Sequence, residues 1–283
     1  MGRNHKLRHA DVAYKSEAFM ESLAARPLRI MAEYFDPLTR LRKENVGDTI
    51  VIFGSARILP RDIARKRLKQ AERPTRGRIS PARQQKIREA HRAVEMSRYY
   101  EEARELARRI TAWSMTLGES PRRFVVCSGG GPGIMEAANR GAAEAGGKSI
   151  GLGIQLPHEQ LPNPYISPEL NFNFHYFFMR KLWFSQLAKA LIVFPGGFGT
   201  MDERWEMLTL MQTEKLHHGN PILIYGRRFW DDVLDWRALV RWGVISEEDY
   251  GLLQFADNVD DAFRQIKAGL EKHHLHLDTD WKW

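Results

Sequence analysis

The feature that most constrains the fold is an apolar run followed at once by a glycine-rich turn and a helical pattern. Residues 190–194 read Ala-Leu-Ile-Val-Phe, residues 195–200 read Pro-Gly-Gly-Phe-Gly-Thr, and a helical pattern follows from Arg204 to Lys215. This order builds phosphate sites in α/β folds, because a glycine backbone can approach an anion and a helix N-terminus points free N–H groups at it. Thr200 can add a hydroxyl, and Glu203 places a carboxylate on the first turn of the helix.

The same alternation recurs along the chain. Apolar runs that read as strands lie at 49–53, 124–128, 149–154, 170–174, 221–225 and 251–255. Helical patterns lie at 80–113, 134–145, 229–242 and 257–271. Strands that alternate with helices predict a Rossmann-like, doubly wound parallel sheet. Ligands of such sheets bind beyond the carboxyl ends of the strands. Three of these ends are marked here, by Gly54-Ser55, by Gly129 to Gly133 and by Gly196 to Thr200.

The domain boundaries follow from this pattern. We expect a helical N-terminal arm over 1–45, a main domain over 46–272 and a C-terminal tail over 273–283, with a basic helical insertion at 57–100 after the first strand. In the arm, Ser16 is expected to cap one helix, and a second helix that starts near Pro27 is expected to end at Pro37.

The net charge of +8 is concentrated in the insertion, where Arg57 to Arg92 holds thirteen Lys/Arg residues against three Asp/Glu. Such a block can bind nucleic acid or an acidic surface, or it can be a solvated helical face. No aromatic residue interleaves with these charges before Tyr99, so the stacking platform of a nucleic-acid site is missing. The sequence therefore favours attraction of phosphorylated small molecules, or contacts with a neighbouring subunit, over nucleic-acid binding.

Other features bound the location and the metal content. No apolar run approaches the ~20 residues that span a bilayer, and Met1 to Lys6 precede no stretch typical of a signal peptide. The single cysteine, Cys127, suits a reducing compartment, so we expect a cytoplasmic protein. His273, His274 and His276 are predicted to lie in a polar, unstructured tail rather than in a metal site, and no metal or cofactor is expected.

The common nucleotide motifs do not fit. The chain contains no G-x-x-x-x-G-K-[ST] motif, so a P-loop NTPase is disfavoured. Neither glycine-rich turn has the G-x-G-x-x-G spacing, since Glu136 stands where the last glycine of the first turn would be. Hydride transfer is therefore disfavoured as well. A carboxylate beside an anion-holding loop instead suits cleavage of a sugar–base bond, whose oxocarbenium-like transition state needs a negative group.

Several of these segments resemble the LOG (Lonely Guy) family. Pro195 to Glu203 is similar to the family's P-G-G-x-G-T-x-x-E signature, and Arg180-Lys181 resembles its arginine–lysine pair. Gly129 to Met135 resembles its first glycine-rich loop, and Phe53-Gly54-Ser55 resembles its first strand turn. The resemblance covers roughly residues 46–272 and implies a Rossmann-like homodimer or larger homo-oligomer.

The resemblance also implies an activity and a site. LOG proteins hydrolyse nucleoside 5′-monophosphates, such as cytokinin ribotides or AMP, to free base and ribose 5-phosphate, and members have often been labelled lysine decarboxylases. By resemblance, Glu203 and Arg180 are the catalytic pair. The residues expected to bind substrate are Gly196, Gly197, Gly199, Thr200, Gly130, Gly131, Ser55, Glu206 and Lys181.

The sequence leaves some alternatives open. A non-catalytic nucleotide sensor or carrier on the same fold would share the glycine loops but would not need Glu203 beside them. The segment Glu136 to Asn139 departs from the short plant-like members, as do the insertion and the arm. These differences put cytokinin ribotides in doubt as the main substrate. Glu136 could enter the pocket or be an exposed helix residue.

Overall fold

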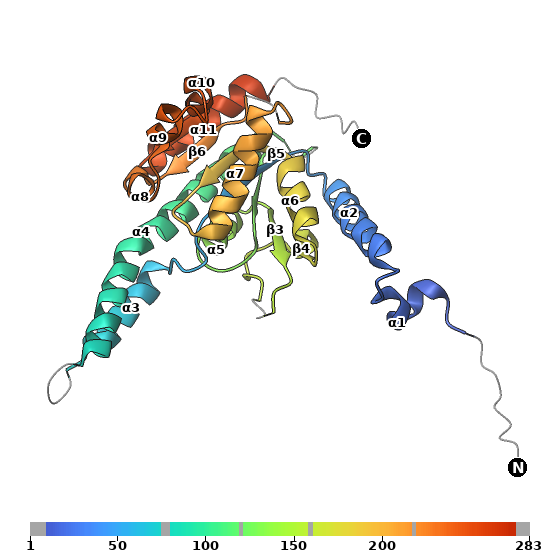
Figure 1. The fold of residues 1–283 in the computed structure, drawn as a ribbon, viewed down its shortest axis with the longest axis horizontal. Helices are drawn as coiled ribbons and strands as arrows, with labels where there is room; N and C mark the ends of the chain where they lie inside the picture. The colour runs from blue at the N-terminus through green and yellow to red at the C-terminus, as the bar shows by residue number, and fades with distance from the viewer. Residues whose placement is uncertain (1–9, 75–79, 119–120, 158–160, 217–218, 276–283) are drawn as a thin grey trace, which may run out of the picture.

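A computed structural model describes residues 10–74, 80–118, 121–157, 161–216 and 219–275. Its centre is a seven-stranded parallel sheet with the strand order β4-β3-β2-β1-β5-β6-β7 (Figure 1). The order reverses between β1 and β5, which makes their carboxyl ends the topological switch point of the sheet. The predicted Rossmann-like parallel fold is confirmed.

The strands lie close to the predicted runs. They are β1 Thr49–Phe53, β2 Val125–Ser128, β3 Ser149–Ile154, β4 Asn171–Phe174, β5 Ala188–Val193, β6 Ile222–Tyr225 and β7 Leu253–Ala256. In the central pair Phe53 lies opposite Val193, so the two strands end together and their following loops emerge side by side.

The helices connect these strands and extend the chain at its beginning. They are α1 Glu17–Met20, α2 Arg26–Lys43, α3 Arg61–Ala71, α4 Pro81–Met115, α5 Ile134–Glu144, α6 Phe177–Gln186, α7 Phe198–Gln212, α8 Arg227–Val233, α9 Trp236–Arg241, α10 Glu247–Gly251 and α11 Val259–His273. Two short 3-10 turns, Ala13–Lys15 and Pro168–Leu170, complete the regular structure of the described residues.

Two apolar cores lie on the two faces of the sheet. Along β1, Val51 and Phe53 face a core shared with α2, α6 and α7, while Ile50 and Ile52 face a core shared with α4, α5 and α11. This alternation follows from the period of two in a strand. Because both faces are covered, every residue of β1 is buried, as expected for a parallel sheet.

The prediction that Pro37 ends the second helix is wrong. Helix α2 runs through Pro37 to Lys43. A proline inside a helix leaves the carbonyl of the residue four positions earlier without its usual N–H partner. Here that carbonyl belongs to Glu33, and the indole Nε1 of Trp183 in α6 donates to it at 3.0 Å. A contact 150 residues away in the sequence thus satisfies the carbonyl.

Two further predictions need correction. The helix expected over 229–242 is two helices, because Leu234 is extended and the Asp235 carboxylate accepts from the Ala238 N–H to start α9. The histidines were placed in a polar tail, but α11 continues to His273 and His274 is buried, with its carbonyl accepting from Arg123 at 2.8 Å. His276 lies outside the described residues.

The insertion after β1 forms a helical hairpin, α3 with the first half of α4, which projects beyond the sheet (Figure 1). The second half of α4, from Ser97 to Ser114, packs in the core against α5. One continuous helix therefore connects the basic hairpin to the part of the molecule that covers the sheet. None of the helices in the described ranges is long and apolar enough to cross a membrane.

Candidate functional site

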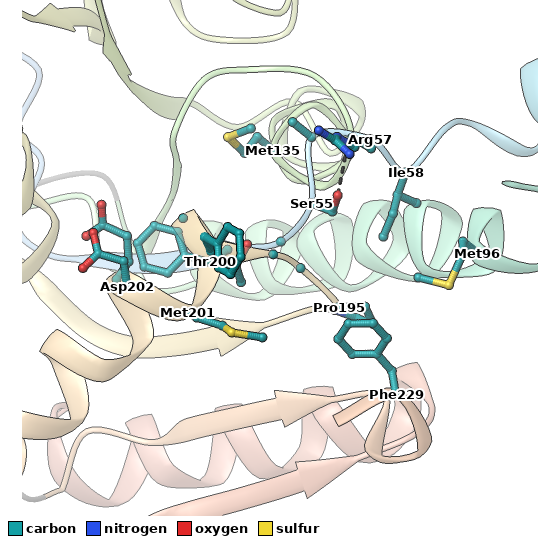
Figure 2. A pocket seen from close by; sticks show the side chains of 18 of the residues that line it. Ser55, Arg57, Ile58, Met96, Met135, Pro195, Thr200, Met201, Asp202 and Phe229 are labelled. Atoms are coloured by element: carbon teal, nitrogen blue, oxygen red, sulfur yellow. Dashed lines mark hydrogen bonds between the residues drawn. The ribbon is translucent and has the colours of Figure 1, made fainter. Parts of the chain in front are cut away.

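A cavity of about 1030 Å³ opens at the switch point, beyond the carboxyl ends of β1 and β5. The loop after β1, the loop after β5 and the first turn of α7 form one side of it. Figure 2 shows Thr200 and Asp202 on the α7 side, facing Ile58 and Met96 across the opening, with Phe229 beside them. Of the predicted site residues, Ser55, Arg180, Gly196, Gly197, Gly199, Thr200 and Glu203 line this cavity.

The loop Pro195 to Thr200 presents free backbone donors to the cavity. Gly197 caps α7, and the first backbone bond of the helix comes from the Met201 N–H, so the N–H groups of Phe198, Gly199 and Thr200 lie ahead of the helical ladder. A side chain at Gly197 or Gly199 would meet no atom within 4 Å, so both positions face open space. This geometry suits an anion that contacts the backbone itself.

Gly196 has a different role from Gly197. A Cβ at Gly196 would lie 2.1 Å from the Thr200 hydroxyl oxygen. The absence of a side chain there lets Thr200 fold back over the loop, where it is 8% exposed and lines the cavity. Gly196 therefore permits the close packing of the turn, while Gly197 and Gly199 leave space for a ligand.

The loop after β1 is tied to both glycine-rich loops. The Ser55 N–H donates to the Pro195 carbonyl at 3.0 Å, and the Ser55 carbonyl accepts from the Ile134 N–H at 3.1 Å. Gly133, with φ of +71°, has no room for a side chain, since a Cβ would lie 2.3 Å from the Ser55 carbonyl oxygen. The three loops predicted to meet at one edge thus form one hydrogen-bonded unit.

Arg180 reaches the cavity from α6. Its Nε donates to the Leu152 carbonyl at 2.9 Å, and its guanidinium lies 5.1 Å from the centre of the Phe184 ring. Gly129 makes room for it, because a Cβ there would lie 2.7 Å from an Arg180 terminal nitrogen. Burial lowers the pKa of Arg180, and the charge of Glu203 opposes this shift. The two terminal nitrogens are left to contact a ligand.

Glu203 is buried in the second turn of α7, one turn later than the sequence predicts because the helix already begins at Phe198, and 6% of its surface is exposed. No hydrogen bond or ion pair joins its carboxyl group to another of the described residues. Burial raises its pKa to about 7, although the charges of Arg180 and Lys181 pull in the other direction. A carboxyl group that titrates near neutrality in a cavity is a common property of catalytic acids and bases.

Lys181 and Glu206 are not among the cavity-lining residues. The Lys181 ammonium group lies 2.9 Å from Asp202 and 3.0 Å from Glu206, so it links two carboxylates on the flank of α7. The sequence spacing predicts Glu206 on the same helix face as Glu203, but Glu206 pairs with Lys181 and does not line the cavity as Glu203 does. In this arrangement both residues hold α6 and α7 together beside the site.

Gly130 and Gly131 also lie outside the cavity lining. Their carbonyls accept hydrogen bonds from the side-chain amide of Asn163 at 3.0 and 3.1 Å. The same amide donates to the Asn139 oxygen at 2.9 Å, and Asn139 in turn donates to the Ile150 carbonyl. The first glycine-rich loop is therefore held from behind by two buried asparagines. Neither asparagine carried a sequence signal, because their contacts are brought together by the fold.

Glu136 follows neither of the two alternatives that the sequence left open. Its carboxylate accepts a hydrogen bond from the Tyr100 hydroxyl at 2.7 Å, which ties α5 to α4. Residues of α4 and α8 that sequence reasoning missed do line the cavity, among them Arg92, Met96 and Phe229. The sequence offers no periodic or motif signal for them, because they reach the site from helices far along the chain.

The described residues contain no group of three or more His, Cys, Asp or Glu side chains placed to hold a metal ion. Cys127 is buried in β2, where burial raises the pKa of its thiol. It behaves as a small core residue of the sheet.

The fold and the cavity define a doubly wound α/β protein with a cavity at the switch point of its sheet, lined by a glycine-rich loop and the N-terminus of α7. Residues 135–266 match a protein-family model described as "Possible lysine decarboxylase". The match includes Arg180 and the whole of the loop from Pro195 to Glu203. This segment of the chain therefore matches the LOG family, and the resemblance of the motifs within it, Arg180-Lys181 and Pro195 to Glu203, is confirmed. No curated protein matches the chain significantly.

Solved structures with weaker similarity include three proteins. The Moco carrier protein from Chlamydomonas reinhardtii is 18% identical, with a TM-score of 0.45 over 80% of this chain and 98% of that one. The molybdenum cofactor binding protein from Rippkaea orientalis is 18% identical, with a TM-score of 0.42 over 60% of this chain and 86% of that one. The structural-genomics target TM1055 is 19% identical, with a TM-score of 0.43 over 78% of this chain and 99% of that one.

Proposed function

We propose that this protein hydrolyses the N-glycosidic bond of a nucleoside 5′-monophosphate, giving free base and ribose 5-phosphate. The observation that carries the proposal is the position of Glu203, a buried carboxyl group with a pKa of about 7 beside the anion-binding loop. Binding a phosphate alone is hindered by a carboxylate next to it. A reaction whose transition state develops positive charge on the ribosyl group, in contrast, requires a carboxylate beside it.

Each residue has a role in this reaction. The free N–H groups at the start of α7 and the Thr200 hydroxyl hold the 5′-phosphate, with Gly197 and Gly199 allowing its close approach. Arg180 contacts the ligand through its terminal nitrogens. Ser55 lines the same space from the loop after β1. No cofactor or metal enters the proposed reaction.

The bond changes balance as a hydrolysis. The C1′–N bond breaks and its electron pair leaves with the base, which takes up a proton. Ionised Glu203 stabilises the oxocarbenium-like ribosyl group and accepts a proton from the attacking water. The water oxygen bonds to C1′ and completes ribose 5-phosphate. This assignment makes the ionised form of Glu203 the active one.

The test is a chromatographic product assay over a panel of nucleoside 5′-monophosphates. We expect release of free base and ribose 5-phosphate, and a loss of roughly 10²–10⁴-fold in kcat/KM for Glu203→Gln. Glu248→Gln, which changes a carboxylate of α10 outside the cavity, is the matched control. Binding of nucleotides with no turnover by the native protein would contradict the proposal and identify a non-catalytic sensor or carrier.

We also propose that the protein is a homodimer or larger homo-oligomer. Phe177 and Phe178 at the start of α6 are 52% and 50% exposed, and Phe198 at the start of α7 is 92% exposed. Phe177 and Phe198 line the cavity and Phe178 follows Phe177 in α6, and exposed large apolar rings of this kind are typical of a surface that a partner covers. Light scattering after size exclusion should show an oligomer that Phe178→Asp disrupts and Val244→Asp, at another exposed apolar residue, does not. A monomeric native protein would refute this proposal.

A further inference from the structure

The cavity has a second wall that the glycine-rich loops do not supply. Helix α4, whose first half belongs to the basic hairpin, contributes Arg92 and Met96, and the part of the β1 loop that follows the Gly54-Ser55 turn contributes Arg57 and Ile58. Phe229 of α8 closes the cavity on the same side. The volume of about 1030 Å³ is at the upper end of the range for small-molecule sites, roughly 300–1,000 Å³. The wall formed by α4 therefore encloses more space than the phosphate loop needs.

Two guanidinium groups on this wall are available to a ligand. The side chains of Arg57 and Arg92 are exposed, and neither forms an ion pair with another residue in the described ranges. The one carboxylate of α4 that faces the cavity, Glu89, accepts a hydrogen bond from the Gln85 amide at 2.7 Å. The wall is thus more positive than negative on the side opposite the phosphate loop.

The cavity adjoins a smaller hollow beyond Arg92. This hollow has a volume of about 210 Å³ and shares Arg92, Met96 and Phe229 with the main cavity. It adds Arg228 from α8 and Arg98 from α4, against the carboxylates Glu95 and Asp232. Arg98 is already engaged, since it donates to the Tyr99 hydroxyl at 2.7 Å. Arg228 is exposed, and its side chain forms no hydrogen bond or ion pair with another of the described residues.

The surface between the two charged ends is apolar. Met96 and Phe229 belong to both hollows, and Ile58 lies beside them in the main cavity. An apolar lining of this kind suits a base or another ring. Across the site, the phosphate loop is therefore followed by an apolar centre and then by a group of cationic side chains.

We propose that Arg92 and Arg228 form a second anion subsite, so that the ligand of this protein is a nucleotide with a second anionic group at the end remote from its 5′-phosphate. The inference rests on the proposed function for the identity of the first group. Both a phosphate on the ribose 3′ side and a carboxylate on the base meet the description, since guanidinium groups bind either. Arg57 lies at the edge of the same wall and adds to its charge.

The experiment measures binding by titration calorimetry at low ionic strength, in the full-length Glu203→Gln variant so that turnover does not interfere. The probes are AMP, adenosine 3′,5′-bisphosphate, and AMP with a dicarboxyethyl group on the exocyclic nitrogen of the base. One of the last two should bind roughly tenfold or more tightly than AMP, and the gap should shrink as salt is added. Which probe gains affinity identifies the source of the second anion.

Substitutions then locate the subsite. Arg92→Ala and Arg228→Ala should each remove most of the gap between the favoured probe and AMP while leaving the affinity for AMP within about threefold. Arg88→Ala is the matched control, because Arg88 lies one turn from Arg92 on α4, donates to Gln85 and lines neither hollow. Thermal melts of each variant establish that the fold is intact.

Two outcomes would overturn the inference. Equal affinity for all three nucleotides would mean that no second anion is recognised. A gap that persists in both Arg92→Ala and Arg228→Ala would place the second group elsewhere. The hydrolysis assay on AMP is independent of both outcomes, so a failure of the subsite and a failure of the proposed reaction can be told apart.

Discussion

At the scale of single residues, the site depends on what surrounds Glu203. The carboxyl group is buried and the charges of Glu206 and Asp202 raise its pKa further, while Arg180 and Lys181 lower it. Burial is the largest of these effects. The position of Glu203 in the motif indicated a functional carboxylate. Its ionisation near neutral pH depends on the burial and charges that the fold creates.

The pKa of about 7 predicts the pH dependence of the proposed reaction. Since the ionised carboxylate is the active form, kcat/KM should rise as pH increases through about 7 and level off above it. In Arg180→Ala the rate should fall and the midpoint should move to higher pH, because a positive charge that lowers the pKa of Glu203 is lost. The second ionisation of the substrate phosphate, near pH 6, is the same for both proteins. A midpoint that stays in place would argue against Glu203 as the titrating group.

The glycines of the phosphate loop give a second prediction at this scale. Gly197→Ala should leave the melting temperature unchanged, because a side chain there meets nothing within 4 Å and φ is −98°. It should still weaken binding of a nucleoside monophosphate by roughly tenfold or more, since the methyl group occupies the space that the phosphate would approach. Gly196→Ala is the contrasting variant and should lower the melting temperature, because its Cβ would overlap Thr200. Unchanged binding by Gly197→Ala would contradict the assigned phosphate position.

At the scale of elements, one buried ion pair joins β1, β2 and the end of α11. Asp48, just before β1, is fully buried and lies 2.7 Å from the Arg123 guanidinium. It also accepts from the Phe124 N–H, where the backbone has a positive φ of 54°. Arg123 in turn donates to the His274 carbonyl at 2.8 Å. Burial raises the pKa of Asp48 in spite of Arg123, so the group depends on its hydrogen bonds to stay ionised.

Removing Asp48 should therefore be costly. Asp48→Ala leaves a largely buried guanidinium, whose side chain is 10% exposed, and a buried N–H without their partner, and we expect a loss of about 3–5 kcal/mol in the free energy of unfolding. Urea denaturation measures it. Asp36→Ala is the matched control, since the Asp36–Arg40 pair on α2 has side chains 60% and 31% exposed and should contribute under about 1 kcal/mol. Similar losses for both variants would show that burial does not determine how much these ion pairs contribute to the free energy of unfolding.

At the scale of the whole molecule, the two halves of the long helix α4 lie in different environments. The half of α4 from Ser97 to Ser114 is part of a core, with Leu106 and Ile110 fully buried. In the projecting hairpin of α3 and the first half of α4, Ala64 and Ala90 are the buried residues of the described part. This hairpin therefore has little apolar burial to resist local opening, even though its second helix continues into the well-packed half of α4.

This difference predicts the pattern of amide hydrogen exchange. Amides of α3 and of α4 before Ala90 should exchange at least about a hundredfold faster than those of α4 from Tyr99 to Ser114, because local opening there exposes little apolar surface. The favoured probe of the second anion subsite should slow exchange around Arg92 more than AMP does. Exchange monitored by mass spectrometry on the native protein measures both effects. Uniform protection along α4 would contradict the first expectation.

The sequence alone determined the parallel sheet, the order of its strands and helices, and the convergence of the three glycine-marked loops. These follow from local patterns, since hydrophobic period, turn glycines and helix starts depend on neighbouring residues. It also indicated Arg180, Thr200 and Glu203, which line the cavity because each lies in the first two turns of a helix whose position the topology dictates.

Only the tertiary structure decided the rest. Helix α2 continues past Pro37 because Trp183, far along the chain, donates to the carbonyl that the proline leaves without a partner. Lys181 and Glu206 form an ion pair with each other and do not line the cavity. The fold also raised the pKa of Glu203 by burial and brought Arg92 and Arg228 to adjoining hollows from separate helices. All of these depend on contacts between segments far apart in the chain, and on the water that packing excludes. Neither leaves a periodic signal in the sequence.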